Sequence, residues 1–83
     1  MPFSLSFTEE FKHDLARLDN SIKQRLPKIF DKIKENPTLA KPLHGKWGYY
    51  RIRFLNYRII YHVFEKEERV LLVAIGKRDV VYG

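Results

Sequence analysis

Three arginines alternate with apolar residues over one short stretch of this chain, at Arg51, Arg53 and Arg58. Successive side chains of a β-strand point to opposite faces, so Arg51 and Arg53 share one face and the intervening apolar residues the other. If Leu55 and Asn56 form a two-residue turn, antiparallel pairing places Arg53 directly opposite Arg58. Like charges opposed across a ladder lower stability, whereas planar guanidinium groups bind phosphate well. The pattern therefore predicts an anion-binding face.

Two further groups extend this cationic set toward the C-terminus. Lys77 and Arg78 follow a long apolar run, and Tyr82 comes four positions later. The phenol of Tyr82 is a candidate to donate or accept a proton, or to stack on a base. Trp47 and Tyr49 are also candidates for base stacking. Three other tyrosines are expected in the core by strand parity, at Tyr50, Tyr57 and Tyr61.

The placement of charge also favours a polyanionic partner. The formal net charge is +6. Residues 41–83 carry nine Lys or Arg against four Asp or Glu, for +5, whereas residues 1–40 carry seven against six, for +1. This excess lies in the half that is expected to form the sheet, which points to a polyanion as partner. A basic surface that serves solubility alone is the alternative.

Length and composition predict a single domain over residues 1–83. The chain has no cysteine, which excludes disulfides and thiolate zinc sites, and it lacks a signal peptide or an apolar run long enough to cross a membrane. We expect a cytoplasmic protein. Glycine-rich phosphate loops and nucleophile elbows are missing, and His13, His44 and His62 are scattered, so neither a metal nor a cofactor is expected.

The periodicities predict an α+β fold in the order β-α-α-β-β-β. Strands are expected over 3–7, 49–54, 57–64 and 69–76, and a first helix over 8–18 with Thr8 as its cap. A second helical pattern runs from Ser21 to Asn36. Pro27 interrupts this pattern, so either the helix is kinked there or it begins late, after a separate turn. The helical hairpin should pack on a small twisted antiparallel sheet.

The order of these motifs resembles the RelE/ParE toxin superfamily, and its RelE branch in particular. The resemblance covers nearly the whole chain. It rests on Lys41-Pro42-Leu43, Tyr50-Arg51-Ile52-Arg53, Asn56-Tyr57-Arg58-Ile59-Ile60-Tyr61, Ala74-Ile75-Gly76-Lys77-Arg78 and Tyr82. It implies the microbial RNase-like toxin fold and a toxin of a type II toxin–antitoxin system. RelE-type toxins cleave mRNA in the ribosomal A site, where the ribosome with its 16S rRNA is a binding partner. They are bound by a RelB-like antitoxin in a hetero-oligomer.

The resemblance also implies roles for individual residues. Arg58 and Arg78 correspond to the transition-state arginines of the family, and Tyr82 to its terminal tyrosine. Arg51 and Arg53 stand where some members have lysines, and arginine is a poor proton acceptor because its pKa exceeds about 12. We therefore expect Arg51, Arg53 and Lys77 to hold phosphate and Tyr82 to act as the base, in a metal-independent endoribonuclease.

Two other functions are compatible with the same fold. One is a ParE-like toxin that inhibits DNA gyrase by binding protein, without RNA cleavage. The other is an inactive binding partner that is kept for regulation. The arginine cluster and Tyr82 favour the nuclease.

Overall fold

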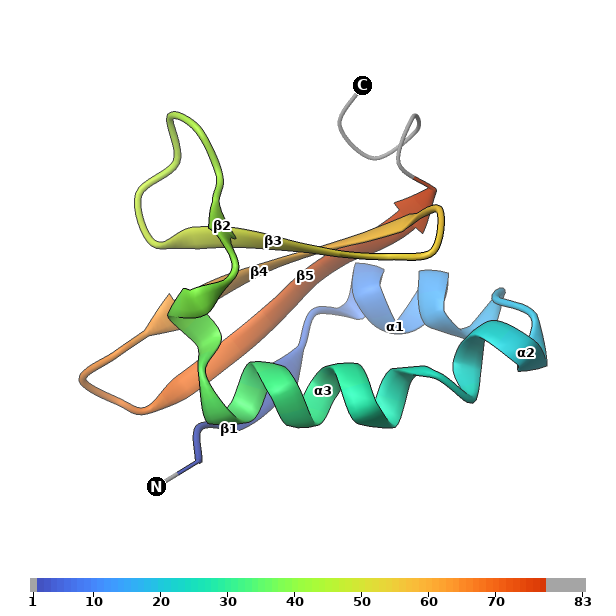
Figure 1. Cartoon of the computed structure of the whole chain (residues 1–83), viewed down its shortest axis with the longest axis horizontal. Helices are drawn as coiled ribbons and strands as arrows, with labels where there is room; N and C mark the ends of the chain where they lie inside the picture. The colour runs from blue at the N-terminus through green and yellow to red at the C-terminus, as the bar shows by residue number, and fades with distance from the viewer. Residues whose placement is uncertain (1, 78–83) are drawn as a thin grey trace.

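The computed structural model describes residues 2–77, which form one sheet with a helical layer on one side (Figure 1). The helices are α1 (Glu9–Ala16), α2 (Asn20–Lys23), α3 (Leu26–Glu35) and the 3-10 turn η1 (Pro37–Leu39). The strands are β1 (Ser4–Phe7), β2 (Lys41–Pro42), β3 (Tyr49–Phe54), β4 (Tyr57–Phe64) and β5 (Arg69–Lys77). The predicted α+β class and the predicted positions of the long strands are confirmed.

The sheet has five strands in the order β1-β5-β4-β3-β2. The predicted antiparallel arrangement holds for β3, β4 and β5, and β2 also pairs antiparallel with β3. The first strand differs from the prediction, because β1 runs parallel to β5. A parallel neighbour requires a long connection, and the helices and the hairpins between β1 and β5 provide it. Strand β2 was not expected from the sequence, because two residues are too few to show a period.

The helices begin where local chemistry allows. The Thr8 hydroxyl accepts a hydrogen bond from the Phe11 amide at 3.0 Å, which caps α1, and donates one to the Val73 carbonyl at 3.1 Å. Pro27 lies in the first turn of α3, where a missing amide proton costs nothing. The late start of the second helix is therefore the correct alternative, with α2 as the separate turn, and a mid-helix kink at Pro27 is not formed.

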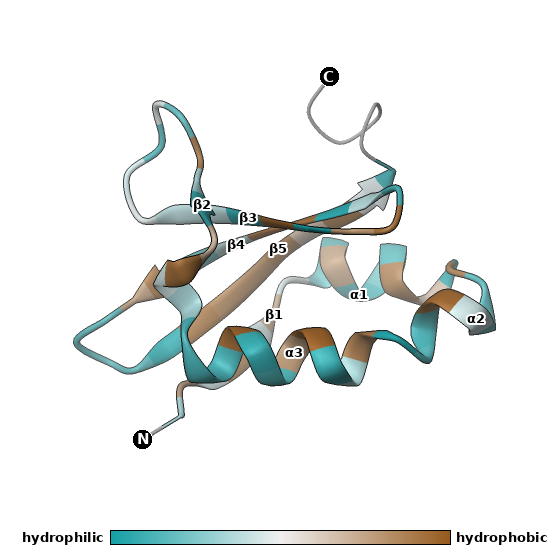
Figure 2. Cartoon of the chain, viewed as in Figure 1, coloured by the Kyte–Doolittle hydropathy of each residue, from teal (hydrophilic) through white to brown (hydrophobic). Residues whose placement is uncertain are grey.

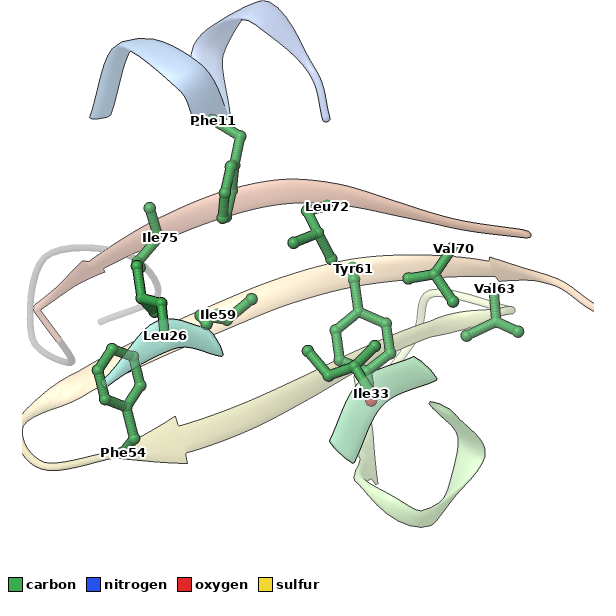
Figure 3. Packing of buried hydrophobic residues seen from close by; sticks show 10 residues of the cluster. All are labelled: Phe11, Leu26, Ile33, Phe54, Ile59, Tyr61, Val63, Val70, Leu72 and Ile75. Atoms are coloured by element: carbon green, nitrogen blue, oxygen red, sulfur yellow. The ribbon is translucent and has the colours of Figure 1, made fainter. Parts of the chain in front are cut away.

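The core lies between the helical layer and the sheet. Its buried residues come from α1, α3 and the three longest strands (Figure 3). They are Phe11, Leu26, Ile33, Phe54, Ile59, Tyr61, Val63, Val70, Leu72 and Ile75. Figure 2 shows the hydrophobic residues of α3 on its side toward the sheet and hydrophilic residues on the other side. Tyr50 and Tyr57 pack against this cluster, as strand parity predicts.

Tyr61 ties the end of the helical layer to the sheet. Its hydroxyl donates a 2.7 Å hydrogen bond to the Pro37 carbonyl within the buried interior. Burial disfavours the charged phenolate, with Tyr50 nearby adding to the effect, so the pKa of Tyr61 lies far above its ordinary value. This bond fixes η1, which leads directly into β2.

Candidate functional site

The register of the β3–β4 hairpin is the one predicted from the sequence. Arg53 pairs with Arg58, and Ile52 pairs with Ile59. Leu55 begins the turn with φ of 53°. Paired residues of neighbouring strands point to the same face. The side chains of Arg51, Arg53 and Arg58 therefore project from the face of the sheet that is opposite to the core. We call this side the outer face. The helices of the described chain all lie on the other side (Figure 1).

The three arginines of the outer face differ in exposure. Arg53 is exposed, Arg51 is half-buried, and Arg58 retains only 7% of its accessible surface. Arg58 pairs on β5 with Gly76, which has no side chain to occupy the space over the ladder. Ile60, the next outer-face residue of β4, is fully buried. Because the Arg58 side chain is buried against the sheet, its guanidinium has little conformational freedom left to lose on binding a ligand.

Lys41 adds a fourth cation to the outer face. In the ladder between β2 and β3, Lys41 lies directly opposite Arg51. A shallow cavity of about 280 Å³ is lined by Lys41, Arg51 and Arg53, with Ala40 and Ile52. No acidic side chain within residues 2–77 forms an ion pair with Lys41 or Arg51. This concentration of positive charge is suited to a phosphate backbone.

The Nε atom of Arg51 is buried and has no hydrogen-bond partner within the described part of the chain. An unsatisfied buried donor costs free energy, and a fold without a ligand gains nothing from it. A water molecule or a ligand that accepts the hydrogen bond would satisfy this atom. A phosphate oxygen is an acceptor of this kind.

Of the remaining residues predicted for the site, the structure describes only Lys77. Lys77 ends β5 and pairs with Tyr57, so by register it leaves the sheet on the core side, away from Arg58. Arg78 and Tyr82 are outside the described residues. Among residues 2–77, no three His, Asp or Glu side chains gather as ligands for a metal ion. None of the helices within that range is long and apolar enough to span a membrane.

A family model described as the ParE toxin of type II toxin–antitoxin systems, parDE, matches residues 5–82. The chain belongs to the ParE toxin family. The resemblance to the RelE/ParE superfamily is therefore confirmed.

Individual relatives of this ParE-family chain are RelE proteins. It is 27% identical over 82 residues to the mRNA interferase toxin RelE of Escherichia coli K12. The alignment covers 95% of this chain and 86% of the relative. The mRNA interferase RelE of Shigella flexneri matches equally well.

Solved structures show the same fold. The intact E. coli RelBE toxin–antitoxin complex matches with a TM-score of 0.81 at 25% identity, covering 90% of this chain and 95% of the other. The RelB-RelE antitoxin–toxin complex of Methanococcus jannaschii matches with a TM-score of 0.75 at 26% identity, covering 93% and 94%.

The sequence did not predict Lys41 as a phosphate-binding residue of this ParE-family chain. In the sequence Lys41 belongs only to a motif of the family resemblance, because a two-residue strand gives no periodic signal. Its position becomes significant only once β2 is paired with β3. The basic residue and the following proline, which suits an edge strand, were the signals available.

Proposed function

We propose that this chain is the toxin of a type II toxin–antitoxin module and a ribosome-dependent endoribonuclease that cleaves mRNA in the ribosomal A site. The observation that carries the proposal is the outer face itself, where Lys41, Arg51, Arg53 and Arg58 gather on neighbouring strands. The family, and the curated relatives described as mRNA interferases, support the same activity.

The proposed reaction needs positioning and charge stabilisation more than strong acids and bases. The ribose 2′-hydroxyl loses its proton and attacks the adjacent phosphorus, and the bond to the 5′-oxygen of the next nucleotide breaks. That oxygen takes up a proton, which leaves a cyclic phosphate and a new 5′-hydroxyl. Arg58 and Arg78 stabilise the charge on the non-bridging oxygens. Arg51 and Arg53 hold the phosphate, whereas Lys77, which leaves the sheet on the core side, is not part of this contact.

Tyr82 is assigned as the base in this proposal, because arginine does not give up its proton at working pH. The ribosome supplies the alignment of the 2′-hydroxyl with the scissile bond, and such alignment accounts for a large part of the rate. Tyr82→Phe should therefore abolish cleavage while leaving mRNA binding intact. Unchanged cleavage by this variant would remove Tyr82 from the mechanism.

The decisive experiment maps new 5′ ends after induction of the chain in cells that carry one message in a translated and an untranslated copy. Cuts confined to the translated copy are expected. Cuts in both copies would contradict dependence on the ribosome, and the lack of cuts during growth arrest would contradict the nuclease.

A second candidate is a gyrase-inhibiting toxin, which the description of the family model as ParE favours. Replacing Arg51, Arg53, Arg58 and Arg78 together with alanine should abolish growth arrest if RNA is the target. The same change should leave arrest unaltered if the toxin acts through a protein surface elsewhere. A matched control replaces four exposed cations of the helical layer, namely Arg17, Arg25, Lys28 and Lys32. Growth arrest without cuts, insensitive to the arginines, would favour gyrase.

We also propose a cognate RelB-like antitoxin as partner, in a hetero-oligomer. Two of the matched solved structures are described as complexes with RelB. On this chain, a groove of about 510 Å³ lies beside η1 and includes Ile33, Ile52 and Leu39, which is 80% exposed. An amphipathic acidic segment that folds on binding could place apolar side chains in this groove and its charge near the basic sheet.

A further inference from the structure

Another hollow lies on the sheet, at the opposite end of β3 from the Arg53–Arg58 pair. Its volume is about 650 Å³, and it is bounded by the loop between β2 and β3 and by the start of the turn after β4. Lys46 and Trp47 line it from the loop, and Tyr49 and His62 line it from the sheet. Trp47 is 97% exposed, which is rare for so large an aromatic side chain. We call this hollow the aromatic pocket.

The floor of the aromatic pocket is the end of a row of planar side chains. Tyr49 stacks on His62 with ring centres 4.2 Å apart and planes within 14°. His62 lies 4.3 Å from Phe64, and the guanidinium of Arg69 lies 4.4 Å from the Phe64 ring. The row crosses β3, β4 and β5 on the outer face. Arg69 is held in turn by Glu67 at 3.1 Å and by the Ser6 hydroxyl at 3.2 Å.

This row fixes the Tyr49 ring before any ligand binds. The His62 ring packs closely against Gly48, because a Cβ at position 48 would lie only 2.9 Å from His62 Nε2. Lys46 Nζ lies 5.9 Å from the centre of the Tyr49 ring. An aromatic side chain that is already oriented loses little entropy when a second flat group stacks on it. Every nucleobase offers such a flat face.

The aromatic pocket lies next to the arginines of the outer face along β3. Tyr49 precedes Arg51 by two residues on the same strand and face, a separation of roughly 7 Å. From Tyr49 to Arg53 the distance along β3 is about 13 Å, which a short run of nucleotides can span. The rim carries Lys46 and Lys66 against a single acid, Glu65. Positive charge that runs on from the arginines matches a single-stranded phosphate backbone.

We infer that the aromatic pocket binds a nucleobase of single-stranded RNA, next to the nucleotide whose phosphate the arginines hold. The base stacks on Tyr49 and is bordered by Trp47, and Lys46 lies near its phosphate. This inference rests on the proposed nuclease function and adds a base-contacting subsite to it. The pocket takes the base by stacking and has few groups to distinguish one base from another, so it supplies affinity and register.

The test uses two probes of equal length and charge. One is a 2′-O-methyl RNA hexamer, which binds but cannot react because the attacking hydroxyl is blocked. The other carries the same backbone without bases. Trp47 is the single tryptophan of the chain, so its fluorescence reports directly on the aromatic pocket. We expect the hexamer with bases to quench this fluorescence, and the abasic probe to leave it nearly unchanged.

Substitutions then separate stacking from charge. Tyr49→Ala should weaken binding of the hexamer by about tenfold or more, and of the abasic probe by less than about twofold. Tyr49→Phe keeps the ring and should restore the wild-type affinity. Arg51→Ala should weaken both probes. Lys28→Ala removes an exposed cation of the helical layer, away from the outer face; it is the control and should change neither.

Each other outcome counts against a specific claim. Equal losses for both probes with Tyr49→Ala, or no quenching of Trp47 fluorescence, would overturn the base subsite. Phosphate binding by the arginines of the outer face would not be contradicted by this result. A loss of antitoxin binding alone with Tyr49→Ala would overturn it in favour of a protein contact. No effect of Arg51→Ala on either probe would contradict the proposed function instead. Thermal unfolding of Tyr49→Ala, followed by circular dichroism, identifies losses that come from misfolding.

Discussion

Arg53 lies directly opposite Arg58 across the β3–β4 ladder, yet Arg58 is buried and Arg53 is exposed. The two guanidinium groups therefore leave the sheet from paired positions with different freedom of movement. A buried, fixed cation is suited to charge that develops at one point during a reaction. An exposed one is suited to general attraction of a polyanion.

This difference predicts separate effects for the two arginines. Arg53→Ala should reduce the slope of log affinity for single-stranded RNA against log salt by about 0.7, the contribution of one phosphate contact. Arg58→Ala should instead lower the cleavage rate by about a hundredfold or more, as the loss of one charge-stabilising group does. Binding titrations at several salt concentrations and single-turnover cleavage on ribosomes measure the two effects. Identical behaviour of both variants would refute this division of roles.

Arg51 should serve ligand binding at no benefit to stability. Arg51→Met keeps an extended side chain and removes the buried, unsatisfied Nε. The free energy of unfolding should stay the same or rise by up to about 1 kcal/mol, while affinity for RNA falls. Urea denaturation and RNA titration measure the two quantities, with Arg17→Met on the exposed helical surface as control. A clear loss of stability would show that Arg51 supports the fold.

Tyr61 should make the fold sensitive to alkali. Its folded pKa is raised above the unfolded value, so the stabilisation is fully present below about pH 10 and is lost as the pH rises further. Tyr61→Phe should cost about 1–2 kcal/mol at neutral pH, because the buried Pro37 carbonyl loses its donor, and should remove this part of the alkaline decline.

Urea denaturation from pH 7 to 11 checks the Tyr61 prediction. Tyr49→Phe removes a phenol from the half-buried outer face and should keep the alkaline decline that Tyr61 causes. A decline that persists undiminished in Tyr61→Phe would show that another group is responsible.

Gly48 and Gly45 form a natural pair for measuring the contact with His62. Both have positive φ, of 81° and 78°, but a Cβ on Gly45 would meet nothing within 4 Å. Gly45→Ala should therefore cost only the backbone strain, about 1–2 kcal/mol. Gly48→Ala should cost more, because it also displaces the His62 ring from Tyr49. Comparing the two unfolding free energies isolates this contact, and equal costs would show that the ring moves aside freely.

Local sequence pattern is sufficient to predict the β3–β4 hairpin, its register and the face of its arginines. A period of two over residues 49–64, broken by a two-residue turn, leaves one arrangement that buries the apolar row. It also determined the start of α1, because the Thr8 cap and the apolar residues that follow act within one turn of helix. For Pro27, local chemistry permits both a kinked helix and a late helix start, and the sequence does not distinguish them.

The set of distant segments that meet on the outer face follows from the folded chain and not from local pattern. β2 brings Lys41 beside Arg51, β5 brings Arg69 under Phe64, and β1 joins β5 in parallel. The burial that distinguishes Arg58 from Arg53 was equally hidden, because parity assigns a side chain to a face and says nothing of what surrounds it. The physical reason is range: periodicity and capping act over a few residues, whereas strand order and side-chain stacking depend on the whole chain closing around its core.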